Sequence, residues 1–273
     1  MNKLFRCVLT MSALSAVLSA HAGPVIIGTH DASTLSTAIG GAGVTISNAT
    51  FSTNGSALLP FAAGTFTGGA PSVGFDSGVV LTTGTIACAG GTNTSTGCGL
   101  SRGGSFDTTS LKFDFTSATG NVFFQYVFGS EEYNEFVNSQ FNDQFSLLLN
   151  GVNIAVVPGG GGVVSINNVN CNSNSAFYRN NSSGPCANQG LSIEYDGLTS
   201  ILTATGSVVA GATNSFEFRV FDRGDNILDS GVFIRAGSFS GNDNNDTPEP
   251  STLLLSGLAL VVMGKMRRRK AAR

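Results

Sequence analysis

The sequence predicts an all-β protein, an antiparallel β-sandwich or jelly roll, with a short N-terminal helix and a C-terminal transmembrane helix. Most apolar stretches alternate between apolar and polar side chains with period two, which is typical of half-buried strands. These stretches are short and bounded by Gly, Asn or Asp, and the chain of 273 residues holds 36 Gly and no Trp. Together these features favour many short strands joined by turns.

The first expected element is a helix that begins after Asp31. A carboxylate at this position can accept a hydrogen bond from a backbone N–H of the first helical turn. Leu35, Ala38 and Ile39 share one face of this helix, and Gly40-Gly41 is expected to end it.

The expected strands follow along the rest of the chain. Residues 111–115 and 215–221 alternate cleanly, whereas residues 121–128 and 144–149 are richer in apolar side chains and are expected near the centre of a sheet. Asn150-Gly151 predicts a hairpin, because both residues of such a turn need positive φ. The other expected strands are residues 152–157, 163–166, 191–195, 201–205 and 231–236.

The N-terminus has the three parts of a secretory signal peptide. Lys3 and Arg6 form a basic start, residues 8–18 are mostly apolar, and Ala20-His21-Ala22 is a small-x-small cleavage site. We therefore expect residues 1–22 to be removed and the exported chain to begin at Gly23.

One domain, residues 23–241, is expected between the two ends of the chain. It carries fourteen acidic and six basic side chains, a formal net charge of −8. This charge excludes binding to nucleic acid or to an anionic surface by bulk electrostatics. The domain is long enough for a single hydrophobic core, and the polar residues 242–246 that follow it are expected to begin a linker, residues 242–250.

The last residues of the chain combine a proline-flanked motif, an apolar run and a basic end. The apolar run after Pro248-Glu249-Pro250, residues 251–264, would span about 21 Å as a helix, which is short for a permanent membrane span. Residues 251–273 are therefore expected to be a temporary transmembrane anchor with a cytoplasmic tail. The tail is held by a basic membrane stop made of Lys265, Arg267, Arg268, Arg269 and Lys270.

This C-terminal segment resembles the PEP-CTERM sorting signal of Gram-negative bacteria. The resemblance rests on Pro248, Glu249 and Pro250, on the following Ser251-Thr252-Leu253-Leu254-Leu255, and on the arginine cluster. It implies recognition and cleavage by an exosortase, an intramembrane cysteine transpeptidase. The protein would be anchored transiently in the inner membrane and then displayed at the cell surface or in the extracellular matrix.

A second resemblance extends over about residues 34–239. Residues 78–84 (GVVLTTG), 126–133 (YVFGSEEY), 142–143 (ND) and 229–234 (DSGVFI) are similar to the choice-of-anchor L domain. That family occurs on bacterial surface proteins with interchangeable C-terminal anchors, and its biochemical role is not established. Asn134 stands where the family often has Pro, and Gly231 where Ala is usual.

The exported chain retains four cysteines, and an even number in an exported protein predicts two disulfides. The local pairs Cys88–Cys98 and Cys171–Cys186 are preferred, since each would close one loop rich in Gly, Asn and Ser. The two other pairings remain open. Zinc binding is disfavoured because there is no CxxC motif and the exported chain has one histidine, His30, which we expect to be exposed.

Two acidic clusters, each directly after an expected strand, form a candidate metal site. Hard cations such as Ca²⁺ prefer six to eight oxygen ligands, and carboxylates this close repel unless water or a cation screens them. The clusters are expected at one end of the sandwich, where they would share a Ca²⁺ ion; two solvated acidic loops are the alternative. The candidate ligands are Glu131, Glu132, Glu135, Asp143, Asp222, Asp225 and Asp229.

No convincing catalytic set emerges, so we expect a non-enzymatic binding or structural protein. Its ligand would be exopolysaccharide or a surface partner, bound with Ca²⁺, and Tyr133 and Tyr178, expected in loops, are the candidate ligand-binding residues. The alternative is a glycan-directed hydrolase that uses Glu131 or Glu132 with Asp143 as acid and nucleophile.

Overall fold

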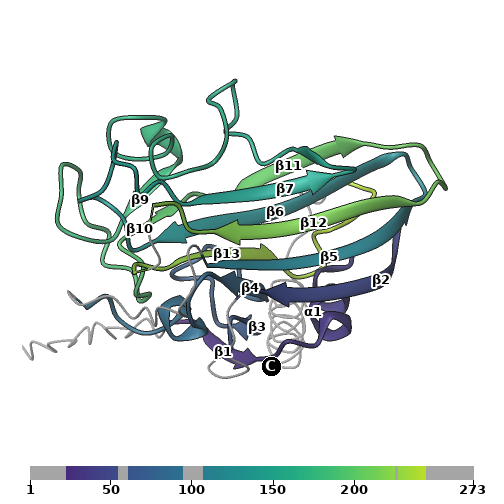
Figure 1. Cartoon of the computed structure of the whole chain (residues 1–273), viewed down its shortest axis with the longest axis horizontal. Coiled ribbons are helices and arrows are strands. Elements are labelled where there is room, and N and C mark those ends of the chain that lie inside the picture. The colour runs from purple at the N-terminus through teal and green to yellow at the C-terminus, as the bar shows by residue number, and fades with distance from the viewer. Residues whose placement is uncertain (1–22, 55–60, 95–106, 225–226, 244–273) are drawn as a thin grey trace, which may run out of the picture.

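A computed structural model describes residues 23–54, 61–94, 107–224 and 227–243, which fold as an antiparallel β-sandwich (Figure 1). The predicted fold class is thereby confirmed. The elements are β1 (Val25–Gly28), α1 (Ala32–Ile39), β2 (Val44–Thr53), β3 (Ala63–Thr67), β4 (Gly78–Thr82), β5 (Thr108–Ser117), β6 (Asn121–Ser130), β7 (Gln144–Leu149), β8 (Val152–Asn153), β9 (Tyr178–Asn180), β10 (Gly197–Thr199), β11 (Leu202–Ser207), β12 (Asn214–Phe221) and β13 (Ser230–Arg235), with short 3-10 helices at Ile86–Ala89 and Ser175–Phe177.

The strands form two sheets that pack face to face. One sheet has five strands in the order β2-β5-β12-β7-β8, and the other has eight in the order β1-β3-β4-β13-β6-β10-β9, with β11 also paired to β6. Every strand pairing in the described ranges is antiparallel. Successive side chains on a strand point to opposite faces, so each strand contributes alternate residues to the space between the sheets.

The core between the sheets is built largely of aromatic rings. Phe216 of β12 lies 5.2 Å from Phe124 of the facing sheet, between ring centroids, and 5.0 Å from Phe239 near the end of the domain. A second apolar cluster, which includes Val80, Val127 and Phe233, covers the other face of the eight-stranded sheet. Strands β4, β6 and β13 are therefore buried on both faces, which explains their nearly continuous apolar sequences.

The predicted helix is confirmed as α1. Its cap residue, Asp31, accepts hydrogen bonds through Oδ2 from the Thr34 backbone N–H at 2.8 Å and from the Thr34 hydroxyl at 2.5 Å. Leu35 and Ile39 are fully buried, and Gly40 caps the C-terminus.

The expected hairpin at Asn150-Gly151 is confirmed. Both residues have positive φ, 50° and 82°, and the turn joins β7 to β8. The second strand ends earlier than expected, at Asn153, because its side-chain oxygen accepts hydrogen bonds from the backbone N–H groups of Leu147 and Ala155. Residues 163–166 form only isolated bridges and no strand.

Residues 191–195 are not a strand, which corrects the expectation. Their backbone pairs with one side chain instead of a neighbouring strand. Asn181 accepts from Leu191 N–H at 2.6 Å and donates to the carbonyls of Ile193 and Tyr195, both at 2.9 Å. An amide side chain can replace a strand partner in this way because it carries both donors and an acceptor.

His30 is half-buried and not exposed as expected. Its ring stacks on Phe51 with centroids 4.8 Å apart, and its Nε2 accepts a hydrogen bond from Ala62 N–H at 3.1 Å. This side chain therefore fixes the packing of β2 against the segment before β3.

The predicted signal peptide, Cys98, the PEP motif and the transmembrane anchor with its basic stop lie outside the described residues. No helix in the four described ranges is long and apolar enough to cross a membrane.

Candidate acidic site

Three aspartates lie side by side where β12 ends and where β5 and β7 begin. This end of the five-stranded sheet is at the left in Figure 1. In the register of this sheet, Phe221 pairs with Thr108 on one side and with Gln144 on the other. One position further, Asp222 N–H donates to the Asp107 carbonyl at 3.0 Å, so Asp107, Asp222 and Asp143 are neighbours across three strands. Their exposed fractions are only 1%, 2% and 1%. We call these three residues the aspartate row.

The facing sheet supplies hydroxyl groups to the row. Asp143 Oδ2 accepts from the Ser230 hydroxyl at 2.7 Å, and its Oδ1 accepts from Arg223 N–H at 2.8 Å. The Thr83 hydroxyl accepts from Ser230 N–H at 2.9 Å. These bonds tie the end of the five-stranded sheet to β13 and to the residue after β4.

Asp222, the middle residue of the row, has an unusual environment. Burial raises the pKa of Asp222 to about 10, and the nearby charges of Asp143, Asp229 and Asp107 add to the rise. Neither of its carboxylate oxygens accepts a hydrogen bond of good geometry, although the Thr83 hydroxyl lies near enough to offset part of the rise. This environment favours the protonated, neutral form of the Asp222 carboxyl group.

A second acidic group lies on the other face of the eight-stranded sheet. Glu131 follows β6 and Asp229 precedes β13, and Glu131 N–H donates to the Asp229 carbonyl at 3.0 Å. Both side chains are buried, and burial together with the charges of Asp229 and Glu131 raises the pKa of Tyr195 well above its ordinary value. The Asp229 carboxylate lies directly over Gly84, where a Cβ atom would meet one of its oxygens at 1.7 Å.

A small pocket opens next to this second group. Four carboxylates line it, those of Glu131, Glu135, Glu194 and Asp196, in a space of about 210 Å³. Thr94 N–H donates to Glu194 at 3.0 Å. Burial raises the pKa of Asp196 to about 6, partly offset by a 2.6 Å hydrogen bond from Asn93. We call this the acidic pocket; Thr94, Phe136 and Leu228 complete its wall.

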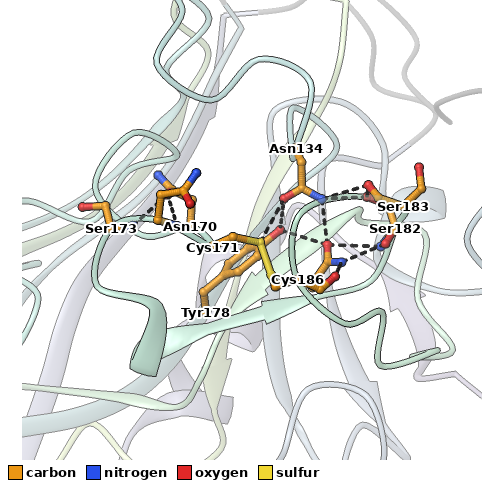
Figure 2. The surroundings of a disulfide bond; sticks show 10 residues. Asn134, Asn170, Cys171, Ser173, Tyr178, Ser182, Ser183 and Cys186 are labelled. Atoms are coloured by element: carbon orange, nitrogen blue, oxygen red, sulfur yellow. Dashed lines mark hydrogen bonds between the residues drawn. A yellow bond between two sulfur atoms is a disulfide. The ribbon is translucent and has the colours of Figure 1, made fainter.

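The predicted disulfide Cys171–Cys186 is present, with 5.8 Å between the Cα atoms. Figure 2 shows it beside Asn134, whose side chain accepts from the Tyr178 hydroxyl at 2.9 Å and donates to Asn180 Oδ1 at 2.8 Å. Cys98 lies outside the described residues, so the pairing of Cys88 with it stays a prediction.

Tyr133 lies in the loop after β6, as expected, but Tyr178 belongs to a strand, and both candidate ligand-binding tyrosines are buried. Tyr133 is fully buried, Tyr178 is 8% exposed and begins β9, and their ring centroids lie 4.8 Å apart. Both rings pack against the core between the sheets. Neither ring has a free face on which a sugar could stack.

The other predicted site residues are divided among these groups. Asp143 and Asp222 lie in the aspartate row, Glu131 and Asp229 in the second group, and Glu135 at the acidic pocket. Glu132 is buried, and its N–H donates to the Ser130 hydroxyl at 3.0 Å. Asp225 lies outside the described residues. Within the described ranges, no three His, Cys, Asp or Glu side chains are already arranged to ligate one metal ion.

Sequence reasoning missed Asp107, Glu194, Asp196 and Tyr195. Asp107 carries a usable signal, since it directly precedes a strand as Asp143 and Asp229 do. Glu194 and Tyr195 lie in residues 191–195, which were expected to form a strand, and Asp196 directly follows them. Glu194 and Asp196 lie close to Glu131 and Glu135 because of a long-range contact, which a local sequence pattern cannot predict.

Comparison with known proteins gives two family matches. The model of the choice-of-anchor L domain matches residues 29–240, and the model of the PEP-CTERM protein-sorting motif matches residues 246–270. Neither the curated proteins nor the solved structures that were compared contain a match.

Proposed function

The chain belongs to the choice-of-anchor L domain family, and from this premise we propose that it is a non-enzymatic binding domain displayed on the surface of a Gram-negative bacterium. Its ligand is a component of the exopolysaccharide or a surface protein, and Ca²⁺ is the proposed cofactor. The PEP-CTERM motif at residues 246–270 marks it as an exported, surface-sorted protein that an exosortase-type enzyme processes.

The acidic pocket is the observation that carries the binding proposal. Four carboxylates around about 210 Å³ favour a ligand with a positively charged group and disfavour an anionic one. The space suits one sugar unit or one side chain rather than a drug-sized ligand. Both large tyrosines of the neighbouring disulfide region are buried, so recognition by charge is a better fit to this surface than aromatic stacking.

A panel of glycans and peptides tests this proposal. The full-length protein, purified in detergent, is applied to immobilised neutral, anionic and amine-bearing glycans and to basic and acidic peptides, with and without Ca²⁺. We expect saturable binding to amine-bearing glycans or basic peptides, weakened about tenfold by Glu194→Gln or Asp196→Asn. Glu217→Gln, on the five-stranded sheet, is the matched control. Binding that survives both pocket substitutions would contradict the proposal.

Sorting is tested separately in cells. Replacing Pro248, Glu249 and Pro250 with Ala should leave the unprocessed chain in the membrane fraction, because the motif and not the folded domain is the processing signal. Release of a shortened chain from this variant would show that processing does not use the motif.

A glycan-directed hydrolase is the second candidate, and Asp196 is the observation that favours it. A carboxyl group whose pKa is raised to about 6 can act as a general acid near neutral pH. The originally expected partner, Asp143, is buried and bonded to Ser230 and Arg223, so the partner carboxylate would be Glu131, Glu135 or Glu194. Reducing ends released from exopolysaccharide by the wild type and not by Asp196→Asn would establish the hydrolase.

A further inference from the structure

The outer face of the five-stranded sheet carries a groove of about 510 Å³ where β12 ends. Alternate side chains of β12 are buried in the core between the sheets, whereas Arg219 and Phe221 lie on the opposite, outer face. Arg223, just beyond the strand, continues this outer row, and Thr108 and Gln140 lie beside it in the groove. We call this space the arginine groove.

The Phe221 ring holds both guanidinium groups of the groove. The Cζ atoms of Arg219 and Arg223 lie over this ring, 5.1 Å and 5.2 Å from its centroid. A guanidinium over an aromatic ring is attracted by the π electrons, but it keeps its full charge and its N–H donors. A carboxylate in the place of the ring would neutralise the two charges. Phe221 therefore positions two cations and leaves them available to a ligand.

The two arginines differ in this respect from the other basic side chains of the domain. Both are exposed, and neither forms an ion pair or a side-chain hydrogen bond within the described residues. The other three Lys and Arg side chains of the described ranges each face a polar partner, Lys112 opposite Glu217, Arg179 with Gln189 and Arg235 with Gln125. The positive charge of the groove is therefore a local exception in an acidic domain.

The neighbouring carboxylates do not neutralise the groove. Asp222 borders it but is 2% exposed, and its raised pKa favours the neutral carboxyl group. Glu217 lies on the same outer face, two residues before Arg219, and its Oε1 accepts a hydrogen bond from the Ser110 hydroxyl at 2.7 Å. Gln140 and Thr108 add neutral donors to the wall. The lining thus favours an anionic ligand that also carries hydroxyl groups.

We propose that the arginine groove binds the carboxylate groups of an acidic polysaccharide, a polymer that contains uronic acids. Each guanidinium presents parallel N–H donors that match the two oxygens of a carboxylate. Gln140 and Thr108 donate to the hydroxyl groups of the same sugars. A space of about 510 Å³ lies within the range of small-ligand sites and accommodates one or two sugar units.

The choice of a polysaccharide over a protein ligand follows from charge and stiffness. A second copy of this domain carries the same net charge of −8 and is repelled. An acidic peptide loses more conformational entropy on binding than a chain of rigid sugar rings. An acidic polysaccharide is repelled at long range as well, but its repeated carboxylates let one chain contact many displayed copies of the protein at once. Binding accordingly depends on direct contact in the groove.

This inference goes beyond the proposed function and concerns a different surface. The acidic pocket is lined by Glu131, which follows β6 of the eight-stranded sheet, and by Glu194 and Asp196. The arginine groove lies on the outer face of the other sheet. A substitution in one site should leave binding at the other unchanged, so the two proposals can fail separately.

The test compares two forms of one polymer. The full-length protein in detergent is applied to immobilised polygalacturonate and to the same polymer with its carboxylates converted to methyl esters. A chelator is present throughout, so that no metal ion bridges the polymer to carboxylates of the protein. We expect saturable binding to the charged polymer and binding at least about tenfold weaker to the ester, because the ester cannot pair with the guanidinium groups.

Substitutions locate the site. Arg219→Gln and Arg223→Gln should each weaken binding about tenfold, and Arg219→Lys should have a smaller effect, since it keeps the charge but loses the planar fork. Phe221→Leu, which keeps both arginines, should weaken binding about threefold because their positions are no longer fixed. Lys112→Gln is the matched control: it removes one exposed positive charge from the same face of the sheet and should keep full affinity. The Tm of the arginine variants should stay near that of the wild type, as both side chains are exposed.

Four results would overturn the inference. Equal binding to the charged and esterified polymers would exclude carboxylate recognition. An equal loss in Lys112→Gln and in the arginine variants would show an effect of bulk charge and not of the groove. Loss of polygalacturonate binding in Asp196→Asn, with the arginine variants unaffected, would place the site at the acidic pocket. Tighter binding to poly-glutamate than to polygalacturonate, lost in the arginine variants, would identify an acidic peptide as the ligand.

Discussion

At the residue scale, the aspartate row and the acidic pocket both contain carboxylates that the fold removes from water. Asp222 accepts no hydrogen bond of good geometry, whereas Asp196 accepts one from Asn93. The pKa of Asp222 is accordingly raised further than that of Asp196, because desolvation disfavours the charged form and a donated hydrogen bond partly restores it.

Gly84 is expected to be intolerant of any side chain. A Cβ atom there would lie 1.7–2.1 Å from the carboxylate atoms of Asp229, which is 1% exposed and has little room to move. Gly84→Ala should therefore lower the free energy of unfolding by about 1–3 kcal/mol, measured by urea denaturation. Gly40→Ala is the control, because its Cβ meets nothing closer than 3.4 Å and its φ is −62°. Equal stability of the two variants would refute the close contact.

Asp196 gives a pH-dependent prediction. Its folded-state pKa of about 6 lies above the ordinary value of 3.8, so its stabilising contribution is complete at low pH and is lost as the pH rises through 6. Relative to Asp196→Asn, the wild type should lose about 1 kcal/mol between pH 4 and pH 7, a figure reduced for solvent screening. Urea unfolding of both proteins at each pH checks this; a difference that does not vary with pH would contradict it.

At the scale of single elements, α1 is the clearest case of an element that was predicted from local sequence and is confirmed by the structure. Its cap, its buried face and its terminating glycine all follow from ten consecutive residues, 31–40. The strands are different, since β4, β6 and β13 are buried on both faces and β1 and β2 on neither completely. The apolar pattern of a segment therefore depends on where its strand lies in the sheet, and not only on whether the segment forms a strand.

Removing the cap of α1 should weaken the whole domain. Asp31→Ala deletes the acceptor for the Thr34 N–H and hydroxyl, and loss of an N-cap costs about 0.5–2 kcal/mol. The loss should appear as a lower Tm and as reduced helical signal in circular dichroism. Asp31→Asn, which keeps an acceptor oxygen, should retain most of the stability; a variant pair with equal losses would argue against capping.

At the scale of the whole molecule, the aromatic core joins the sheets and the end of the domain. Phe239 N–H donates to the Ile39 carbonyl at 3.0 Å, and the Phe239 ring packs on Phe113, Phe115 and Phe216. The two sheets, α1 and the last residues before the linker thus share one core. The exported domain should accordingly unfold as a single cooperative unit.

Phe216 occupies the centre of this core. Phe216→Ala should cost about 3–5 kcal/mol through lost contacts and the cavity left behind, with a Tm lowered by about 10 °C or more. Val209→Ala is the control, since Val209 is 73% exposed. Differential scanning calorimetry measures both, and a small effect at Phe216 would contradict a core shared by both sheets.

The sequence by itself determined the features that are written locally. Alternating apolar residues predicted β5, β6, β7 and β12, and the capping residues predicted α1. Asn150-Gly151 predicted a turn, and the spacing of the cysteines predicted the disulfide Cys171–Cys186. The sorting motif is likewise a contiguous signal, and the family match to it confirms the prediction. Strands β2 and β3 were not predicted because small polar residues dilute their pattern. The short apolar runs of β1 and β4 were not predicted because they lack period-two alternation. Residues 191–195 were wrongly predicted as a strand, since Asn181 provides their hydrogen bonds.

Only the tertiary structure decided how the acidic residues are grouped. Asp107, Asp143 and Asp222 become neighbours through strand register, and Glu131, Glu194 and Asp196 through the packing of an irregular segment on β6. Tyr133 and Tyr178 are hydrophilic enough for a loop surface yet are buried against each other. The physical reason is that a local pattern records which face of an element is apolar, whereas burial and charge proximity depend on which distant element covers that face.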